Sequence, residues 1–145
     1  MTLRFVLDTN QIIGAGTVWL DYGQPASDPN MCRRVLITVA ESHTGLYCGK
    51  IMGEYIEKLL DRKHPPERIQ KMMAYLMGAF TQVQIATQNA PHPPTDKDDE
   101  IFVLCALDGE ADYLVSEDRA LLALKPHYSD FIIGRSAEVG VVLGV

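Results

Sequence analysis

Four carboxylates stand at positions where an α/β protein could bind a divalent cation. Asp8 directly follows the apolar run 3–7, and Asp118 follows the strand-like residues YLVSE. Asp99 opens a helical segment after a polar loop, and Glu54 lies within a turn or so of the strand-like GLYCG. Because ligands bind at the carboxyl ends of strands in a parallel sheet, we expect the four side chains to meet at one edge.

Carboxylate oxygens select hard cations such as Mg²⁺ or Mn²⁺, which polarise a phosphodiester and lower the pKa of bound water. Asp8 and Asp99 are the best candidates for direct ligands. Without a metal ion the four acids repel one another, so some of their pKa values should rise. Histidine ligands are not expected, because the four histidines are scattered through the chain: His43, His64, His92 and His127.

Each acid also has an ordinary structural explanation. Asp8 and Asp118 can cap the helices that follow them, and acids are favoured at the helix N-terminus near Asp99. Glu54 alone is typical of a solvated helix face. The metal site is favoured because a carboxylate follows a buried apolar strand twice and a third acid opens a helix after a loop.

Strand and helix patterns alternate along the chain. Strand-like runs cover 3–7, 45–49, 81–87, 112–118 and 131–134, and helical spacing covers 31–42, 50–62, 67–80, about 96 or 98 to 107, and 119–125. A broken helix is expected over 11–20, followed by a loop at 23–30. This alternation predicts one domain over residues 1–145, an α/β fold with a three-layer α/β/α sandwich and a mainly parallel central sheet.

The bulk composition favours a cytoplasmic protein. No apolar stretch approaches the roughly 20 residues of a membrane span, and the N-terminus lacks the pattern of an export signal. Three cysteines, Cys32, Cys48 and Cys105, lack metal-ligand spacing and are expected to be reduced. The net charge of −6 argues against binding nucleic acid by overall charge, so phosphate contacts must be local.

One local group of cations surrounds Pro65 and Pro66, at the tip of a predicted helical hairpin. Two interpretations are open: a solvated basic turn, or an arm that contacts RNA phosphates without base recognition. The residues of this basic group are Lys58, Arg62, Lys63, Arg68 and Lys71.

The motifs together resemble a known family. VLDTN at 6–10, GEYIEKL at 53–59, DKDDEIFVLCALDGEADYLVSED at 96–118 and the trailing RALLAL resemble the successive motifs of PIN domains, within their toxin-like (VapC-like) subgroup. The resemblance spans about residues 3 to 124. It implies a PIN-like fold in which four acids bind the catalytic metal, in the order Asp8, Glu54, Asp99 and Asp118.

The same resemblance assigns supporting roles to Asn10 and Ser116, and makes Asp96 a helix cap or an outer residue of the site. It implies a Mg²⁺- or Mn²⁺-dependent ribonuclease that acts on RNA, as the toxin partner of an antitoxin protein. The alternative is a non-catalytic PIN-like module that binds RNA or protein. Receiver domains and aspartate-nucleophile phosphatases fit poorly, because the second aspartate of the phosphatase motif is Asn10 here.

The C-terminal tail GRSAEVGVVLGV departs from this pattern, since it is richer in glycine and more apolar than the final helix of the family. Together with the methionine-rich hairpin, this tail offers more apolar surface than a small domain can bury. A homodimer is therefore expected.

Overall fold

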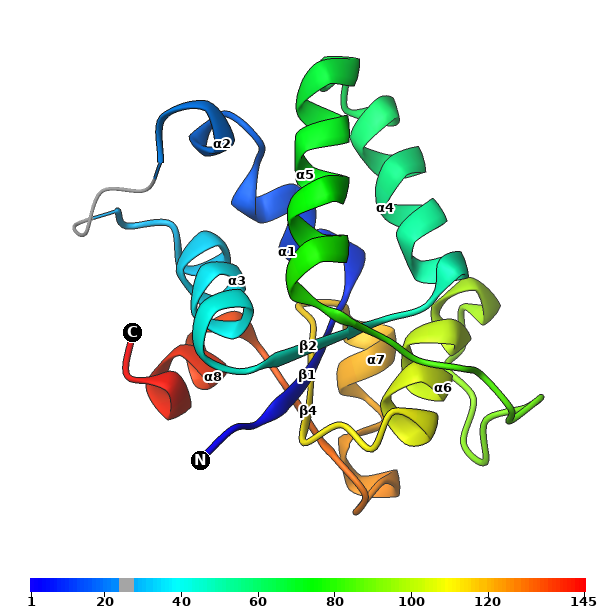
Figure 1. Ribbon diagram of the computed structural model, residues 1–145. Coiled ribbons are helices and arrows are strands. Elements are labelled where there is room, and N and C mark those ends of the chain that lie inside the picture. The colour runs from blue at the N-terminus through cyan, green and yellow to red at the C-terminus, as the bar shows by residue number, and fades with distance from the viewer. Residues whose placement is uncertain (24–27) are drawn as a thin grey trace.

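The computed structural model describes residues 1–23 and 28–145. Five parallel strands form one sheet in the order β3-β2-β1-β4-β5 (Figure 1). The strands are β1 (Arg4–Leu7), β2 (Thr44–Tyr47), β3 (Thr81–Gln82), β4 (Tyr113–Val115) and β5 (Ile132–Gly134). The α/β class and the parallel sheet predicted from the alternating pattern are confirmed.

Helices cover both faces of the sheet. On one side lie α1 (Thr9–Ala15), α2 (Trp19–Tyr22), α3 (Met31–Ser42), α4 (Gly49–Asp61) and α5 (Pro66–Ala79), while α6 (Glu100–Asp108) and α7 (Arg119–Leu122) lie on the other (Figure 1). Helix α8 (Ser136–Leu143) returns to the first side and packs on α3. Short 3₁₀ turns cover Lys97–Asp99 and Lys125–His127. In the part of the chain described, no helix is both long and apolar enough to cross a membrane.

The order of the strands decides where a ligand can bind. The chain runs from β1 outward to β2 and β3, then crosses back to β4 on the opposite side of β1. Since crossovers between parallel strands are right-handed, this reversal moves the later helices to the other face. The crevice between the carboxyl ends of β1 and β4 is the switch point at which α/β proteins bind ligands.

The central strand β1 is held by burial on both faces. Phe5, Val6 and Leu7 are completely buried, as the continuous apolar run predicted. Helix α6 is buried almost all round, because it packs on β1, β2 and β4 and also contacts α4. Its N-terminal end, beside Asp99, is thereby fixed against the core.

The α4–α5 hairpin is confirmed and rises away from the sheet (Figure 1). Lys63 takes a left-handed backbone conformation (φ 64°) that ends the turn after α4, and Pro66 occupies the first turn of α5. Helix α4 buries Tyr55 and Leu59 completely, which leaves Glu54 and Lys58 toward the outside. The helix therefore presents an acid and a base on its exposed face.

Several boundaries differ from prediction, and most predicted strands are shorter in the structure. The strand expected over 81–87 is only Thr81–Gln82, because the Asp108 carboxylate accepts the backbone N–H groups of Ala86 and Thr87 that a strand neighbour would otherwise take. The strand expected at 45–49 lies at Thr44–Tyr47, since Gly49 already begins α4. The predicted broken helix is present as α1 and α2, and the loop predicted at 23–30 falls partly on 24–27, outside the described residues.

Candidate metal centre

Asp8 is held at the carboxyl end of β1 by hydrogen bonds on both carboxylate oxygens. Its Oδ1 accepts from the Thr9 backbone N–H at 2.7 Å, and its Oδ2 accepts from the Ser116 hydroxyl at 2.6 Å. The Asp8 backbone N–H continues the ladder to the carbonyl of Val115 on β4 at 2.9 Å. Burial raises the pKa of Asp8, while the hydrogen bonds from Ser116 and Thr9 oppose the rise. A buried carboxylate with few cations around it favours a bound cation.

Asp118 lies beside Asp8 at the end of the neighbouring strand. Its Oδ1 accepts from the Ala120 backbone N–H at 2.9 Å and so caps α7, while its own N–H donates to the Ser116 hydroxyl at 2.9 Å. The structural role predicted for this acid is therefore present. Capping is not the only role open to this side chain, because half-buried Asp118 also lines the cleft beside Asp8.

Asp99 departs from the capping interpretation. It stands directly before α6, yet its side chain makes no capping hydrogen bond. The side chain is buried, at 8% exposure, and its Oδ2 has no hydrogen-bond partner. Burial, followed by the proximity of the Asp118 carboxylate, raises the pKa of Asp99 to about 8. An unsatisfied buried carboxylate is costly for a folded protein unless a proton or a cation joins it.

Glu54 approaches the other acids from α4. It is half-buried, and burial followed by the negative charge of Asp8 raises its pKa. Glu54 faces a second open hollow, which Lys50, Glu57 and Asp98 also line. Asp8, Glu54, Asp99 and Asp118 thus come together, since each of the three raised pKa values has a contribution from another of these acids.

A cleft opens beside this cluster and brings acids and bases together. It encloses about 210 Å³, room for several water molecules or a phosphate group. Its walls combine two acids, two cations and the start of α1: Asp8, Thr9, Asn10, Ile13, Lys58, Arg62 and Asp118. Lys58 lines both this cleft and the hollow at Glu54.

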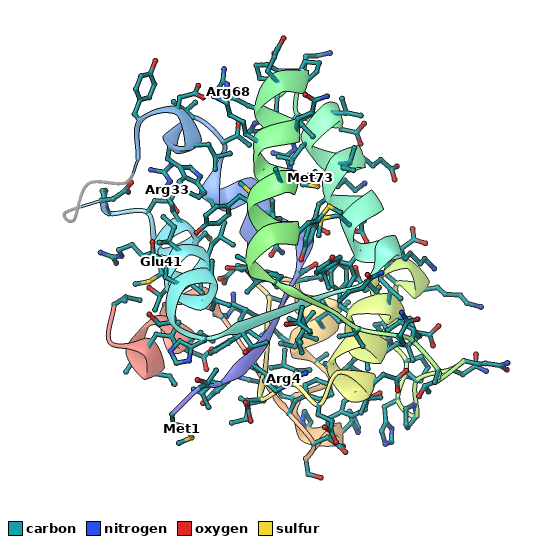
Figure 2. All side chains as sticks on the ribbon, viewed as in Figure 1. Met1, Arg4, Arg33, Glu41, Arg68 and Met73 are labelled. Carbon is teal, nitrogen blue, oxygen red and sulfur yellow. The ribbon has the colours of Figure 1, made fainter. Side chains whose placement is uncertain are left out.

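The other three cations of the predicted basic group do not line the cleft. Lys71 forms an ion pair with Asp21 of α2. Lys63 is exposed in the hairpin turn, and Figure 2 shows Arg68 toward the outer end of the hairpin, away from the sheet. The structure therefore divides the group: Lys58 and Arg62 line the cleft beside the acids. Lys63 and Arg68 lie toward the hairpin tip, and Lys71 is paired with Asp21.

The supporting residues occupy different places. Ser116 is completely buried between Asp8 and the Asp118 backbone, as described above. Asn10 is exposed on the wall of the cleft. Asp96 is exposed and accepts a hydrogen bond from the Asp98 backbone N–H at 3.0 Å, so it caps the turn that leads to Asp99.

Thr9 was not singled out from the sequence. Its hydroxyl is buried without a partner in the described structure, and the residue lines the cleft. Its place between Asp8 and Asn10 is the one sequence feature that could have indicated it.

The sequence of the chain matches a known protein family. The profile of the PIN domain matches residues 4–120. The chain belongs to the PIN-domain family. Among curated proteins, the comparison gives no match.

Among solved structures, this PIN domain is similar to VapBC2 from Rickettsia felis, whose crystal structure holds a DNA fragment from the promoter of that system. The match covers 92% of this chain and 98% of the other, with 12% sequence identity and a TM-score of 0.54. At this identity the likeness concerns the fold. The match extends beyond the PIN profile toward the C-terminal part of the chain, so the similarity of architecture includes most of the protein.

PIN domains generally bind a divalent metal ion. In residues 1–23 and 28–145, no three His, Cys, Asp or Glu side chains already stand in a closed ligand arrangement. The open donor set nevertheless fits: the free Oδ2 of Asp99 is buried beside Asp118, and Asp8 and Glu54 add further oxygens. Oxygen donors suit Mg²⁺ or Mn²⁺.

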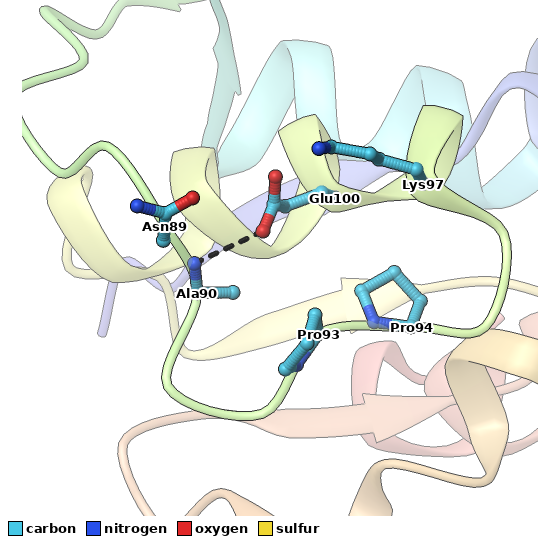
Figure 3. A pocket seen from close by; sticks show the side chains of 6 residues that line it. All are labelled: Asn89, Ala90, Pro93, Pro94, Lys97 and Glu100. Atoms are coloured by element: carbon cyan, nitrogen blue, oxygen red, sulfur yellow. Dashed lines mark hydrogen bonds between the residues drawn. The ribbon is translucent and has the colours of Figure 1, made fainter.

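A separate cavity lies under the loop before α6 (Figure 3). It is lined by Asn89, Ala90, Pro93, Pro94, Lys97 and Glu100. Glu100 points across it, and its carboxylate accepts the Ala90 backbone N–H at 3.1 Å (Figure 3). Among the residues that the structure describes, Glu100 is the one acidic residue that lines this cavity, and its carboxylate anchors the loop. The described lining of the cavity therefore lacks the several carboxylates that a metal ion would need.

Proposed function

We propose that this PIN domain is a divalent-metal-dependent endoribonuclease, whose metal ligands and catalytic residues are Asp8, Glu54, Asp99 and Asp118. The observation that carries the proposal is the buried, unpartnered Oδ2 of Asp99, beside Asp118 and next to a cleft lined by Lys58 and Arg62. A buried carboxylate oxygen without a partner, beside a cationic wall, is what a metal-assisted phosphodiesterase needs.

Each residue has a separate task in this proposal. Asp99 and Asp8 would hold the cation directly, while Glu54 and Asp118 would complete the ligand set directly or through water. A bound Mg²⁺ or Mn²⁺ would polarise the phosphodiester and lower the pKa of its water. Ser116 fixes the orientation of the Asp8 carboxylate, and Asn10 offers a polar group at the rim of the cleft.

RNA contacts are assigned to the basic group in two parts. Lys58 and Arg62 lie close enough to the acids to neutralise the phosphates next to the cleaved bond. Lys63, Arg68 and Lys71 lie farther out, where they would attract the strand without touching the reacting phosphate. Such contacts go to the backbone and do not select a base sequence.

The role of toxin in a toxin–antitoxin pair is part of the proposal. It is supported by the similarity in fold to the VapBC2 structure. If the chain is a toxin, its expression in a bacterial host should stop growth, and Asp8→Asn should relieve the arrest at equal protein level. Normal growth with abundant, folded wild-type protein would contradict this role.

The activity itself is tested with labelled single-stranded RNA in Mn²⁺ or Mg²⁺. Wild type should cut the RNA, and EDTA should abolish the cleavage. Asp8→Asn, which keeps the size of the side chain and removes its charge, should lower the rate by orders of magnitude. Cleavage that persists in EDTA, or at full rate in Asp8→Asn, would reveal a contaminating nuclease and overturn the assignment.

A second candidate function is a non-catalytic module that binds RNA or protein through the same surface. Lys58 and Arg62 on the cleft wall would serve such a module equally well. Retained binding of RNA, with no cleavage of varied sequences in either metal, would favour this alternative over the ribonuclease.

A further inference from the structure

Glu117 stands between Ser116 and Asp118 in sequence, but its carboxylate accepts hydrogen bonds from residues of two other segments. Its Oε1 accepts the backbone N–H of Ser136 at 2.8 Å and the hydroxyl of Ser136 at 2.7 Å. The same oxygen accepts from the Gln11 side-chain amide at 3.4 Å. One half-buried oxygen thus gathers donors from two other segments.

Together with the loop that carries Glu117, these two segments form three corners at the carboxyl ends of β1, β4 and β5. Gln11, only 1% exposed, lies in the first turn of α1, the helix that begins directly after Asp8. Its backbone N–H donates to the Asp8 carbonyl at 2.9 Å. Ser136 is the buried first residue of α8, after β5. The remaining corner, at the end of β4, carries Ser116 and Asp118.

Nothing else described joins all three corners through side chains. The backbone pairs β4 with β1 and β5, but this ladder stops at the Ser116 N–H, which donates to the Gly134 carbonyl at 3.0 Å. Beyond that point the loop is held by the Ser116 hydroxyl, by the Asp118 cap and by Glu117. Arg135 adds only an exposed ion pair to Glu117 at 3.5 Å.

We propose that Glu117 is a positioning residue, which ties the loop that carries Ser116 and Asp118 to α1 and α8 and so sets the geometry of the metal centre. The inference rests on the proposed metal site, but Glu117 itself does not touch the metal or the RNA. Residues that orient metal ligands through hydrogen bonds commonly change metal affinity by about 10- to 100-fold when they are removed.

The test compares Glu117→Ala, Glu117→Gln and a matched control. A glutamine keeps an acceptor oxygen for Ser136 and Gln11, so Glu117→Gln should retain the affinity of wild type. Asp108→Ala is the control, because Asp108 also accepts two backbone N–H groups and a hydroxyl, from Ala86 and Thr87, far from the acids. The two alanine variants lose similar numbers of hydrogen bonds.

Two measurements separate positioning from mere stability. Titration calorimetry with Mn²⁺ should show about 10- to 100-fold weaker binding in Glu117→Ala than in wild type, with little change in Asp108→Ala or Glu117→Gln. Without metal, hydrogen exchange should speed up at the Asp118 amide by about tenfold in Glu117→Ala alone.

The outcomes are distinct. Wild type that binds no Mn²⁺ would contradict the proposed metal site, while the exchange at the Asp118 amide would still decide the role of Glu117. The inference would be overturned if Glu117→Ala and the control Asp108→Ala had the same Mn²⁺ affinity and the same rate of hydrogen exchange at the Asp118 amide. Loss of affinity in Glu117→Ala, with recovery in Glu117→Gln, would support it.

Discussion

The hydroxyl of Ser116 donates to Asp8 Oδ2 at 2.6 Å, and this contact joins residues that are 108 positions apart in sequence. The oxygen of the Ser116 hydroxyl in turn accepts the backbone N–H of Asp118 at 2.9 Å. The Ser116 hydroxyl therefore orients the Asp8 carboxylate as a hydrogen-bond donor and positions the Asp118 backbone as an acceptor. Because Ser116 is completely buried, no water can readily replace it.

We expect Ser116→Ala to weaken Mn²⁺ binding by about 10- to 100-fold, since the Asp8 carboxylate loses its orientation. Unfolding by urea in EDTA should show a free energy of unfolding lower by about 1–3 kcal/mol, because buried partners are left unpaired. Thr38→Ala, which removes a hydroxyl bond to the Arg34 carbonyl within α3, is the control for stability alone. Equal Mn²⁺ affinity in the two variants would contradict a role for Ser116 in the site.

Metal-free stability should depend on pH through Asp99. Its pKa is about 8 in the folded protein and 3.8 as an ordinary aspartate, so the folded state binds more protons than the unfolded state between these values. The thermal midpoint in EDTA should therefore fall as the pH rises from about 5 to about 8. Asp99→Asn carries no titrating carboxyl and should flatten this decline. A wild-type profile parallel to that of Asp99→Asn would show that Asp99 is not held protonated.

Mn²⁺ binding should have the opposite pH dependence. A carboxylate must lose its proton before it binds a cation, so affinity should increase as the pH rises toward about 8. Calorimetry in buffers of different ionisation enthalpy should also detect proton release on binding. If the Mn²⁺ affinity stays constant over this range, Asp99 does not lose a proton in order to bind the ion.

The two parts of the basic group should behave differently in RNA binding. The double variant Lys58→Gln, Arg62→Gln should bind single-stranded RNA of any sequence more weakly, and its affinity should depend less steeply on salt, by about one unit of slope per lost phosphate contact. The double variant Lys63→Gln, Arg68→Gln is the matched control, because it also removes two positive charges but at residues that do not line the cleft. Filter binding in Ca²⁺ or EDTA, over a series of salt concentrations, measures both properties. Equal losses in the two proteins would mean that only general charge matters.

Self-association should depend on the outer face of α8. Val141 is 80% exposed and Val142 is 49% exposed there, whereas most methionines of the hairpin are buried and Met77 is the exposed one among them in α5. We expect light scattering to give about twice the monomer mass of 16.1 kDa, and Val141→Asp to shift the protein toward the monomer. A mass near 16.1 kDa at high micromolar concentration would contradict the homodimer.

Much of the fold could be predicted from the sequence because it depends on local patterns. The helices 31–42, 50–62 and 67–80 agree with α3, α4 and α5 to within a residue or so, since apolar residues recur there with the period of a helix. Asp8 and Asp118 were expected at strand ends, and parallel pairing of β1 with β4 brings those ends together. The edge strand predicted at 81–87 was too long, because periodicity cannot reveal that Asp108 takes its backbone donors.

The alternating α/β order, the acids at the strand ends and the basic hairpin could be predicted from the sequence, because each depends on residues close together in the chain. The way in which the polar side chains share their partners depends on the tertiary packing. It left Oδ2 of Asp99 without a hydrogen-bond partner, paired Lys71 with Asp21, and turned Glu117 toward Gln11 and Ser136. Such contacts join residues far apart in sequence. Which partner a side chain reaches depends on how the helices and strands pack, and local sequence patterns do not encode this packing.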